Sequence, residues 1–357
     1  MKSLLIFLTI LCASVANEAT FEEVAKVDGG VWGIDCVDSK NMIFTLKDGR
    51  VGLLHLQSKK INYLKNTPKD IFLKGQGGLM DVALSPDFNK NKEIYFTYAK
   101  AVSNHGATTL AVAKLQGDAL KDWRDLLVTD SLSNSVIHFG SRIAFDSKYL
   151  YFGVGDRGSR ESAQNLKTHK GKILRLYLDG SIPKENPFFQ RTDNTKKEIY
   201  SYGHRNPQGL MYDNTTSKLY SNEHGPRGGD EINIIQAGKN YGWPIASFGR
   251  EYHNNQKIGV EKKNGIENPI KIYIPSIAPS SLIIYHNEKY KFLQGSILST
   301  ALAGSHINGF KLDSKKGSQK EIRIFENLGE RFRVIKECKD NYLYFGTDSG
   351  IIGRIDL

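Results

Sequence analysis

Long apolar runs, cysteine and helical periodicity are scarce in this 357-residue sequence. Beyond the N-terminal segment, no apolar run is long enough to cross a bilayer as a helix, so we predict no stable membrane insertion. Apolar residues almost never recur with a 3.6-residue period, which argues against a helical fold. The chain has only 10 prolines, and no linker rich in proline, serine or glycine divides it. These absences predict a single, largely non-helical domain over residues 17–357.

The N-terminal segment is the exception to this scarcity of apolar runs. Lys2 supplies a positive charge, residues 4–12 are apolar, and residues 14–16 are small. This is the pattern of a secretory signal peptide that is cleaved after Ala16. We therefore predict a signal peptide over residues 1–16 and a periplasmic or secreted protein; an uncleaved membrane anchor is the alternative.

Only three cysteines are present, and removal of a signal peptide would leave Cys36 and Cys338. An oxidising compartment permits a disulfide between them, but their spacing does not require one. The sequence therefore leaves open whether the two thiols pair or stay free.

Basic residues outnumber acidic ones, and the net charge is +11. The lysines are spread over many predicted loops instead of one helix, and an exported protein rarely meets nucleic acid. We therefore predict no nucleic-acid partner and assign most of this charge to solvated surface. A smaller set of arginines remains available for binding an anionic ligand.

The sequence does contain a repeated phrase of strand, polar turn and second strand rich in Tyr, Phe and Ile. It begins near Trp32, Leu79, Arg142, Leu210, Ser280 and Val334. Six such repeats, spaced roughly 50 to 70 residues apart, predict an all-β, six-bladed β-propeller of four-stranded antiparallel blades. Residues 20–27 are expected to add a strand to the last blade. A two-sheet sandwich is the alternative, but the repeats are too many and too far apart for one.

Loops of a propeller meet around its central channel, so residues far apart in sequence can build one site. His138 precedes a predicted strand, and its imidazole could act as a general base near neutral pH. Asp156 ends the same repeat between glycines and could fix the tautomer of that ring. Taken singly, a structural histidine and a turn aspartate are the simpler interpretations.

Several further loops carry hydrogen-bond donors for an anion. Arg205 and Asn206 occur in GHRNPQG, a loop that proline makes rigid. Arg331 and Arg333 alternate along a predicted strand and therefore share a face. Gln76 lies between glycines in KGQGG, where a ligand can approach the backbone closely. A surface salt bridge or a solvated strand face would explain each of these features alone.

The segment NEHGPRGGDEIN places glycine, proline and acids between two strands. Gly225 and Pro226 could turn main-chain carbonyls outward, and oxygen ligands are those that Ca²⁺ accepts. Asp230 and Glu231, together with NYGWP at residues 240–244, could form a second oxygen-rich site. The spacing does not match an EF-hand loop, so these residues alone only suggest a metal.

Seven segments together carry a specific resemblance. They are GQGGLMDVALSPDF, HFGSRIAF, GKILRLYLDGSIPKENPF, EIYSYGHRNPQGL, EHGPRGGDEINII, NYGWP and PSIAPS. In this order the chain resembles, from about Trp32 to its C-terminus, the quinoprotein aldose sugar dehydrogenases related to soluble glucose dehydrogenase. The fold of that family is a six-bladed propeller, which agrees with the repeats.

The resemblance implies two cofactors, pyrroloquinoline quinone (PQQ) and Ca²⁺. His138 matches the catalytic base and Asp156 its partner. The positions matching cofactor contacts are Gln76, Arg205, Asn206, Arg331 and Arg333. The carbonyls of Gly225 and Pro226 match the ligands of the catalytic Ca²⁺, and Glu231 and Tyr241 match a region that binds a structural Ca²⁺.

The implied reaction is oxidation of an aldose at C1 to a lactone. His138 would take the hydroxyl proton, the C1 hydride would pass to PQQ, and a separate electron acceptor would reoxidise the cofactor. The lysine that soluble glucose dehydrogenase supplies to its cofactor is absent near Ala303. A non-catalytic binding propeller and a calcium-dependent propeller hydrolase are the alternatives. Both monomer and homodimer remain open.

Overall fold

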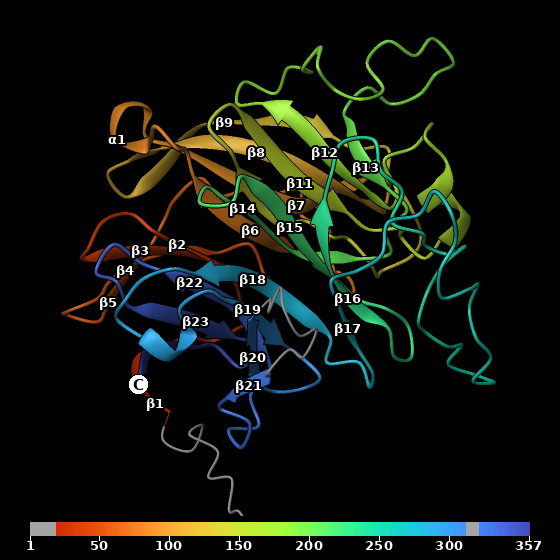
Figure 1. The fold of residues 1–357 in the computed structure, drawn as a ribbon. Helices are drawn as coiled ribbons and strands as arrows, with labels where there is room; N and C mark the ends of the chain where they lie inside the picture. Colours follow the sequence, from red (N-terminus) through yellow and green to blue (C-terminus); the bar gives the residue numbers. More distant parts are fainter. Residues whose placement is uncertain (1–18, 312–320) are drawn as a thin grey trace, which may run out of the picture.

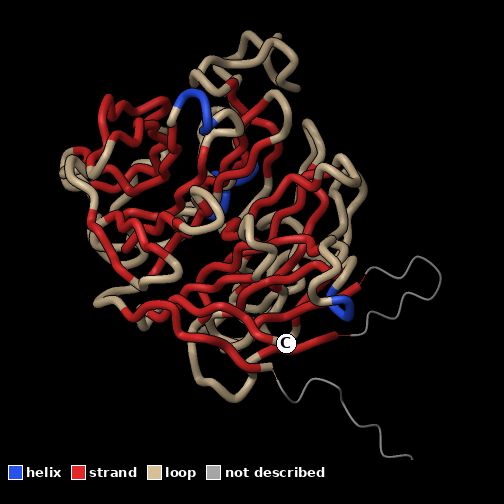
Figure 2. The backbone as a smooth tube through the Cα atoms, turned by 90° about the vertical axis from the view of Figure 1, so that its left-hand side faces the viewer, coloured by secondary structure: helices blue, strands red, loops and turns tan. Residues whose placement is uncertain are grey.

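The computed structural model describes residues 19–311 and 321–357, so the predicted signal peptide lies outside the described residues. Within these ranges nearly all regular structure is β-strand, with three short helical segments (Figure 2). The strands form six sheets of four strands each, joined in antiparallel order (Figure 1). The predicted six-bladed β-propeller is thus confirmed. No helix in the described ranges is both long and apolar enough to span a bilayer.

The first three blades follow the chain from the channel outward. Blade 1 contains β2 (Val31–Cys36), β3 (Asn41–Leu46), β4 (Val51–His55) and β5 (Lys60–Tyr63). Blade 2 contains β6 (Leu79–Leu84), β7 (Glu93–Val102), β8 (His105–Gln116) and β9 (Ala119–Val128), with α1 (Phe88–Asn91) after β6. Blade 3 contains β10 (Ile143–Phe145), β11 (Tyr149–Val154), β12 (Lys172–Tyr177) and β13 (Ile199–Tyr202), with the 3₁₀ helix η1 (Arg160–Gln164) after β11.

The last three blades repeat this order, except that the N-terminal strand completes the final sheet. Blade 4 contains β14 (Pro207–Asp213), β15 (Lys218–Glu223), β16 (Asp230–Ile235) and β17 (Lys271–Tyr273). Blade 5 contains β18 (Pro279–Tyr285), β19 (Ser296–Ala301), β20 (Ile307–Lys311) and β21 (Glu321–Ile324), with the 3₁₀ helix η2 (Lys291–Leu293) after β18. Blade 6 contains β22 (Phe332–Glu337), β23 (Leu343–Thr347), β24 (Ile351–Asp356) and β1 (Thr20–Lys26).

Each sequence repeat corresponds to the first two strands of one blade. The first strands contact those of the neighbouring blades all around the ring, including β22 against β2, and so line the central channel. Both faces of these strands are covered, which is why β2 and β18 are buried along their whole length. The second strands supply large apolar side chains to the clusters between blades: Phe44, Phe96, Phe152, Leu298 and Phe345. Packing between blades therefore accounts for the repeated aromatic positions.

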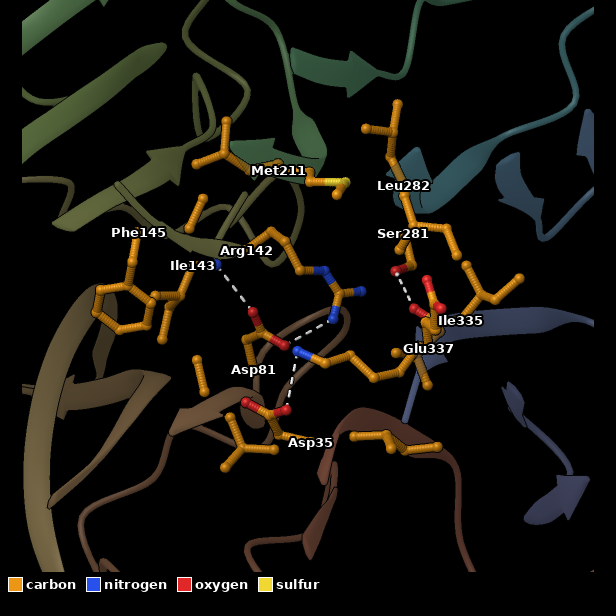
Figure 3. Close-up of a pocket in the computed structure, with 18 of the residues that line it drawn as sticks. Asp35, Asp81, Arg142, Ile143, Phe145, Met211, Ser281, Leu282, Ile335 and Glu337 are labelled. Atoms are coloured by element: carbon orange, nitrogen blue, oxygen red, sulfur yellow. Dashed lines mark hydrogen bonds and ion pairs between the residues drawn. The ribbon is translucent and has the colours of Figure 1, made fainter. Parts of the chain in front are cut away.

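The C-terminal halves of the first strands surround a cavity of about 490 Å³ at one end of the channel (Figure 3). Two ion pairs lie among the side chains that line it. Arg142 Nη1 donates to Asp81 Oδ1 at 2.7 Å, and Lys336 Nζ lies 2.8 Å from Asp35 Oδ1. Arg142 also donates to the main-chain oxygens of Gln208 and Arg333, and so joins several blades across the channel. We call this space the distal cavity.

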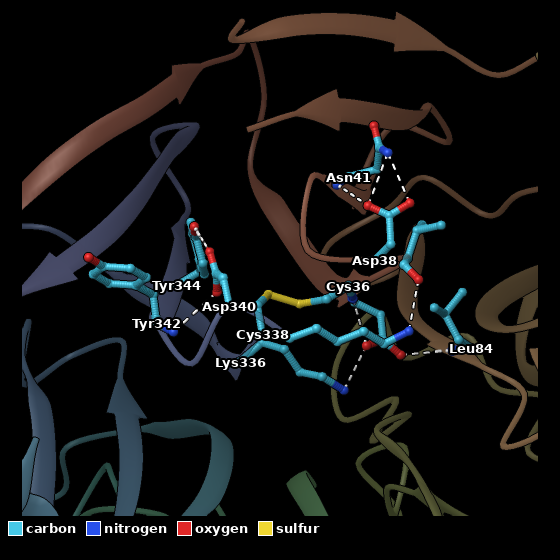
Figure 4. The surroundings of a disulfide bond; sticks show 12 residues. Cys36, Asp38, Asn41, Leu84, Lys336, Cys338, Asp340, Tyr342 and Tyr344 are labelled. Atoms are coloured by element: carbon cyan, nitrogen blue, oxygen red, sulfur yellow. Dashed lines mark hydrogen bonds and ion pairs between the residues drawn. A yellow bond between two sulfur atoms is a disulfide. The ribbon is translucent and has the colours of Figure 1, made fainter. Parts of the chain in front are cut away.

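The ring is closed in two ways between its first and last blades. β1 pairs antiparallel with β24 as the outer strand of blade 6, which confirms the strand expected over residues 20–27. Cys36 and Cys338 form a disulfide, with their Cα atoms 5.5 Å apart (Figure 4). It joins the end of β2 to the residue after β22, across 302 positions of sequence. The pairing that the sequence left open is thus present.

Removing this disulfide is expected to lower the thermal stability of the protein. A cross-link over so long a loop restricts the unfolded chain by about 5 kcal/mol in the loop-entropy model, which corresponds to a Tm decrease of roughly 5–10 °C. The variant Cys36→Ala/Cys338→Ala should show this decrease by calorimetry, and a reducing agent should produce the same decrease in the native sequence. An unchanged Tm in both would mean that β1 alone closes the ring.

Candidate active site

The other end of the channel is built by loops that enter the first strands and loops that leave the second strands. His138 lies in the loop before β10, and Asp156 follows β11 in the same blade. His138 Nδ1 is 2.6 Å from Asp156 Oδ1, and both side chains are almost fully buried. With the Nδ1 proton donated to the carboxylate, Nε2 is an acceptor, and it has no hydrogen-bond partner in the described ranges. The structure thus joins the two residues that the sequence proposed as base and acid.

The backbone at His138 is held in an unusual conformation. Its φ is 57°, in the left-handed region. The main-chain N–H of His138 donates to Gln76 Oε1 at 2.7 Å, and Gln76 N donates to Val136 O at 2.7 Å. Gly155 is required here, because a Cβ at that position would overlap the carbonyl of His138. Gln76 therefore fixes the loop that presents the imidazole.

Charges around the pair keep the acid ionised and the base neutral. Burial, reinforced by the Arg205 guanidinium, lowers the pKa of His138 below its ordinary value of 6.5, although the bond to Asp156 opposes this. Burial alone would raise the pKa of Asp156, but the hydrogen bond and charge of His138 and the N–H of Gly158 hold it below its usual value. At neutral pH the imidazole is therefore free to accept a proton.

A cavity of about 410 Å³ opens beside His138, and we call it the His138 cavity. It is lined by Gln76, His138, Arg205, His224, Gly225, Pro226, Arg227, Gly228, Asp230, Tyr252, Pro275, Ser276, Ala278 and Ala303. Five of the predicted site residues therefore lie around one space. Ala303, where a lysine is absent, adds to that space instead of filling it.

The predicted donor Asn206 lies next to the loop of His138. Its Oδ1 accepts from Gly140 N at 3.1 Å and from Gln208 Nε2 at 3.3 Å. Its Nδ2 is buried and has no hydrogen-bond partner within the part of the chain described. A buried donor without a partner is costly, so this amide is suited to an acceptor atom of a bound ligand.

Arg331 and Arg333 share one carboxylate, which the sequence did not single out. Arg331 Nε donates to Asp348 Oδ2 and Arg333 Nε to Asp348 Oδ1, both at 2.9 Å. Arg333 Nη1 also reaches Gln208 Oε1 at 3.5 Å, and Gln208 bonds Asn206. Arg333 is therefore linked to the donors near His138, whereas Arg331 is half-exposed and bonds Leu302 O. Neither arginine lines the His138 cavity in this conformation.

The loop after β15 brings main-chain carbonyls to the His138 cavity. Arg205 Nη1 donates to Gly225 O at 2.9 Å and to His224 O at 3.0 Å. Gly225 has no room for a Cβ, which would overlap the carbonyl of Gly229. Pro226 O accepts from Ser276 Oγ at 3.3 Å. Gly225 and Pro226 thus both line the cavity, and each carbonyl accepts one hydrogen bond from a side chain.

Asp230 and Glu231 do not form one oxygen-rich site, contrary to the prediction from sequence. They are successive residues of β16, whose side chains point to opposite sides. Asp230 accepts from Gly225 N, Ser276 Oγ and Ala278 N, and so holds two cavity loops together.

Glu231 lines a separate, small cavity of about 20 Å³ together with Glu223 and Tyr241. Burial, then the charge of the neighbouring Glu223, raises the pKa of Glu231 above its usual value. The Tyr241 hydroxyl donates to Ile234 O, and its ring stacks on His204 at 4.8 Å. Two carboxyl groups therefore adjoin one small space, and a bound cation would relieve the repulsion between their charges. In the described ranges no group of three or more His, Cys, Asp or Glu is arranged to hold a metal, so carbonyls would have to complete any coordination.

Two residues near the base were missed from sequence. Trp243 Nε1 donates to Asp156 Oδ2 at 2.7 Å. The ring of His224 lines the cavity, where burial and the charge of Arg205 lower its pKa to about 3, so it is neutral. Its Nε2 bonds Pro279 O at 2.7 Å. Both lie in motifs already noted, NYGWP and EHGPRGG, but the motifs do not reveal which atoms they contact.

Comparisons with known proteins agree on one family. A family model described as glucose/sorbosone dehydrogenase matches residues 29–354. The chain is 36% identical over 319 residues to the aldose sugar dehydrogenase YliI of Escherichia coli, covering 87% of this chain and 85% of that protein. It is also 36% identical over 358 residues to quinoprotein glucose dehydrogenase B of Acinetobacter calcoaceticus, covering 77% and 73%.

The fold agrees with a solved structure as well. The crystal structure of the soluble aldose sugar dehydrogenase from Escherichia coli in its apo-form superposes with a TM-score of 0.89 at 31% identity. The alignment covers 95% of this chain and 99% of that one. The similarity therefore extends over nearly the whole propeller.

Proposed function

Because the chain belongs to the glucose/sorbosone dehydrogenase family, we propose that it is a quinoprotein that oxidises aldose sugars at C1 to lactones. The observation that carries this proposal is the buried His138–Asp156 pair, whose Nε2 is free beside a cavity. The coarser assignment, a sugar dehydrogenase and thus an oxidoreductase, follows from the family. The quinone, the calcium and the roles of individual residues are our proposals.

The residues around the cavity fit an anionic, planar cofactor such as PQQ. Arg205 and Gln76 line the cavity, and Nδ2 of Asn206, which has no partner among the described residues, needs an acceptor. Arg331 and Arg333 lie outside the cavity wall, where Asp348 offsets only part of their charge, and Arg333 is linked to Asn206 through Gln208. When bound, PQQ would supply a two-electron acceptor for the C1 hydride, with Ca²⁺ as a Lewis acid.

The carbonyls of Gly225 and Pro226 fit a hard cation at the cavity wall, since Ca²⁺ prefers oxygen ligands. The buried carboxylates of Glu223 and Glu231 fit a second, structural Ca²⁺. Because the Tyr241 hydroxyl is already bonded, Tyr241 would contribute its main-chain carbonyl there.

The chain's own part in the reaction is the movement of one proton. His138 Nε2 accepts the proton of the C1 hydroxyl, and Asp156 stabilises the resulting imidazolium through Nδ1. Gln76 accepts the hydrogen bond of the His138 main-chain N–H, so the imidazole keeps its orientation during this transfer. A separate electron acceptor then completes the cycle, and the protein acts after export to the periplasm or the medium.

A non-catalytic binding propeller is the second candidate function. The same fold serves binding as well as catalysis, but a binding module has no need of a desolvated His–Asp pair. A hydrolase would need metal-binding side chains deep in the channel. The distal cavity instead holds paired acids and bases.

Reconstitution tests the proposed function directly. The purified protein with PQQ and Ca²⁺ is expected to reduce a redox dye when aldoses are added, and to release the lactone. Omission of PQQ is the control. Dye reduction that is absent for every aldose, despite measurable PQQ binding, would favour the binding module.

A further inference from the structure

Both oxygens of the Asp156 carboxylate are fixed by separate donors. Oδ1 accepts from His138 Nδ1 at 2.6 Å and from Gly158 N at 2.8 Å. Oδ2 accepts from Trp243 Nε1 at 2.7 Å, and Asp156 is fully buried. The indole N–H is the only donor to Oδ2 in the described ranges, so it fixes the second oxygen while His138 and Gly158 hold the first.

Trp243 comes from a different blade and is itself held firmly. It lies in the long connection between β16 and β17, whereas Asp156 belongs to blade 3. Its main chain bonds Gly203 O at 2.9 Å and Gln164 Nε2 at 2.7 Å. Its ring packs on Ala163 and Ile258 and is only 5% exposed. A donor anchored in this way is rigid enough to orient another side chain.

Two arginines lie near the indole ring of Trp243, and one of them lines the His138 cavity. The Arg205 guanidinium, which also bonds the Gly225 carbonyl, lies 5.3 Å from the ring centre. Arg160 lies 5.5 Å from it and forms an ion pair with Glu251 of the same connection. The indole thus contacts both the acid behind the base and an arginine that lines the cavity.

We propose that Trp243 is a positioning residue, whose indole N–H turns the Asp156 carboxylate so that Oδ1 meets His138 Nδ1 and Nε2 stays unprotonated. The assignment of a reaction to this base rests on the proposed function. Without the N–H, Oδ2 becomes a buried acceptor without a partner. The carboxylate then rotates, because the terminal torsion of aspartate is broad, and Nδ1 of His138 loses its fixed acceptor.

Trp243→Phe tests this proposal, because it removes the N–H and keeps most of the ring. Trp123→Phe is the matched control. Trp123 lies in β9, the outer strand of blade 2, where its ring packs on Phe96 away from the site. The first readout is ¹⁵N NMR of the His138 imidazole in the protein without cofactor. We expect Trp243→Phe to lower the share of the Nδ1–H tautomer, and Trp123→Phe to leave it unchanged.

The second readout is kinetic and uses the protein reconstituted with PQQ and Ca²⁺. We expect Trp243→Phe to lower kcat by roughly 10- to 100-fold, with KM for the sugar and the affinity for PQQ within about twofold of the native values. Trp123→Phe should leave all three within this range.

Two outcomes would overturn the proposal. The first is an unchanged tautomer in Trp243→Phe. The second is a lower kcat together with a PQQ affinity that falls by the same factor and a lower Tm. A tryptophan with a merely structural role would cause this combination. If the native protein oxidises no sugar, the proposed function fails, but the tautomer measurement still decides the role of Trp243.

Discussion

His138→Gln is expected to abolish sugar oxidation and to leave the affinity for PQQ nearly unchanged. Glutamine has a similar length and can still donate to Asp156, but it cannot take up a proton. General-base catalysis contributes roughly 100- to 10,000-fold, so the dye-reduction rate should fall by at least the lower of these factors. Fluorescence titration with PQQ, which does not depend on turnover, measures the affinity.

A second buried histidine offers a matched control for this experiment. His169 lies 3.0 Å from Asp130 and 3.5 Å from Glu198, and it is as buried as His138. It does not line the His138 cavity. His169→Gln should therefore keep its turnover, even if the protein becomes less stable. A His138→Gln enzyme that retained turnover within tenfold of the native rate would remove His138 from the role of base.

The architecture was predictable because every blade must bury both faces of its sheet in the same way. A four-stranded sheet with two apolar faces must pack against two neighbours, so its first two strands recur in sequence with buried Phe or Leu at matching places. The strand that closes blade 6 was also predictable, since residues 20–27 have no other sheet to join. The pairing of Cys36 with Cys338 was not predictable, because these cysteines are distant in sequence and only closure of the ring brings them together.

The residues of the candidate site could be proposed from the sequence, but their contacts could not. Motifs identified His138, Asp156 and the arginines, and His138 and Asp156 do form a pair. No pattern indicates that Trp243 reaches Asp156, because the two belong to different blades. Likewise, adjacent acids suggested one metal site, whereas strand alternation sends Asp230 toward the cavity loops and Glu231 to the other side. In each case the sequence lacks the relative positions of side chains in the folded protein.

Chelation is expected to remove activity from the reconstituted protein almost completely. If Ca²⁺ is held by the carbonyls of Gly225 and Pro226, no side-chain substitution deletes those ligands, and depletion of the ion is the direct test. Losing a Lewis acid worth several kcal/mol should lower turnover by more than about 100-fold. Dye reduction is measured after treatment with EGTA and again after addition of Ca²⁺ or Mg²⁺, and Ca²⁺ alone should restore it.

Glu231→Gln separates the two proposed ions. Glu231 lies in the small cavity with Glu223 and not in the His138 cavity. Ca²⁺ at one hundred times its Kd should raise the free energy of unfolding of the native protein by about 2.7 kcal/mol. The variant should lose much of this stabilisation, measured as a smaller rise in Tm when Ca²⁺ is added. Its turnover should still respond to EGTA and Ca²⁺, because the carbonyl ligands are intact. Turnover insensitive to chelation in the native protein would exclude Ca²⁺ from the reaction. A Glu231→Gln variant whose turnover is as low as that of the chelated native protein, and is not restored by Ca²⁺, would mean that the ion near Glu231 is the one that turnover requires.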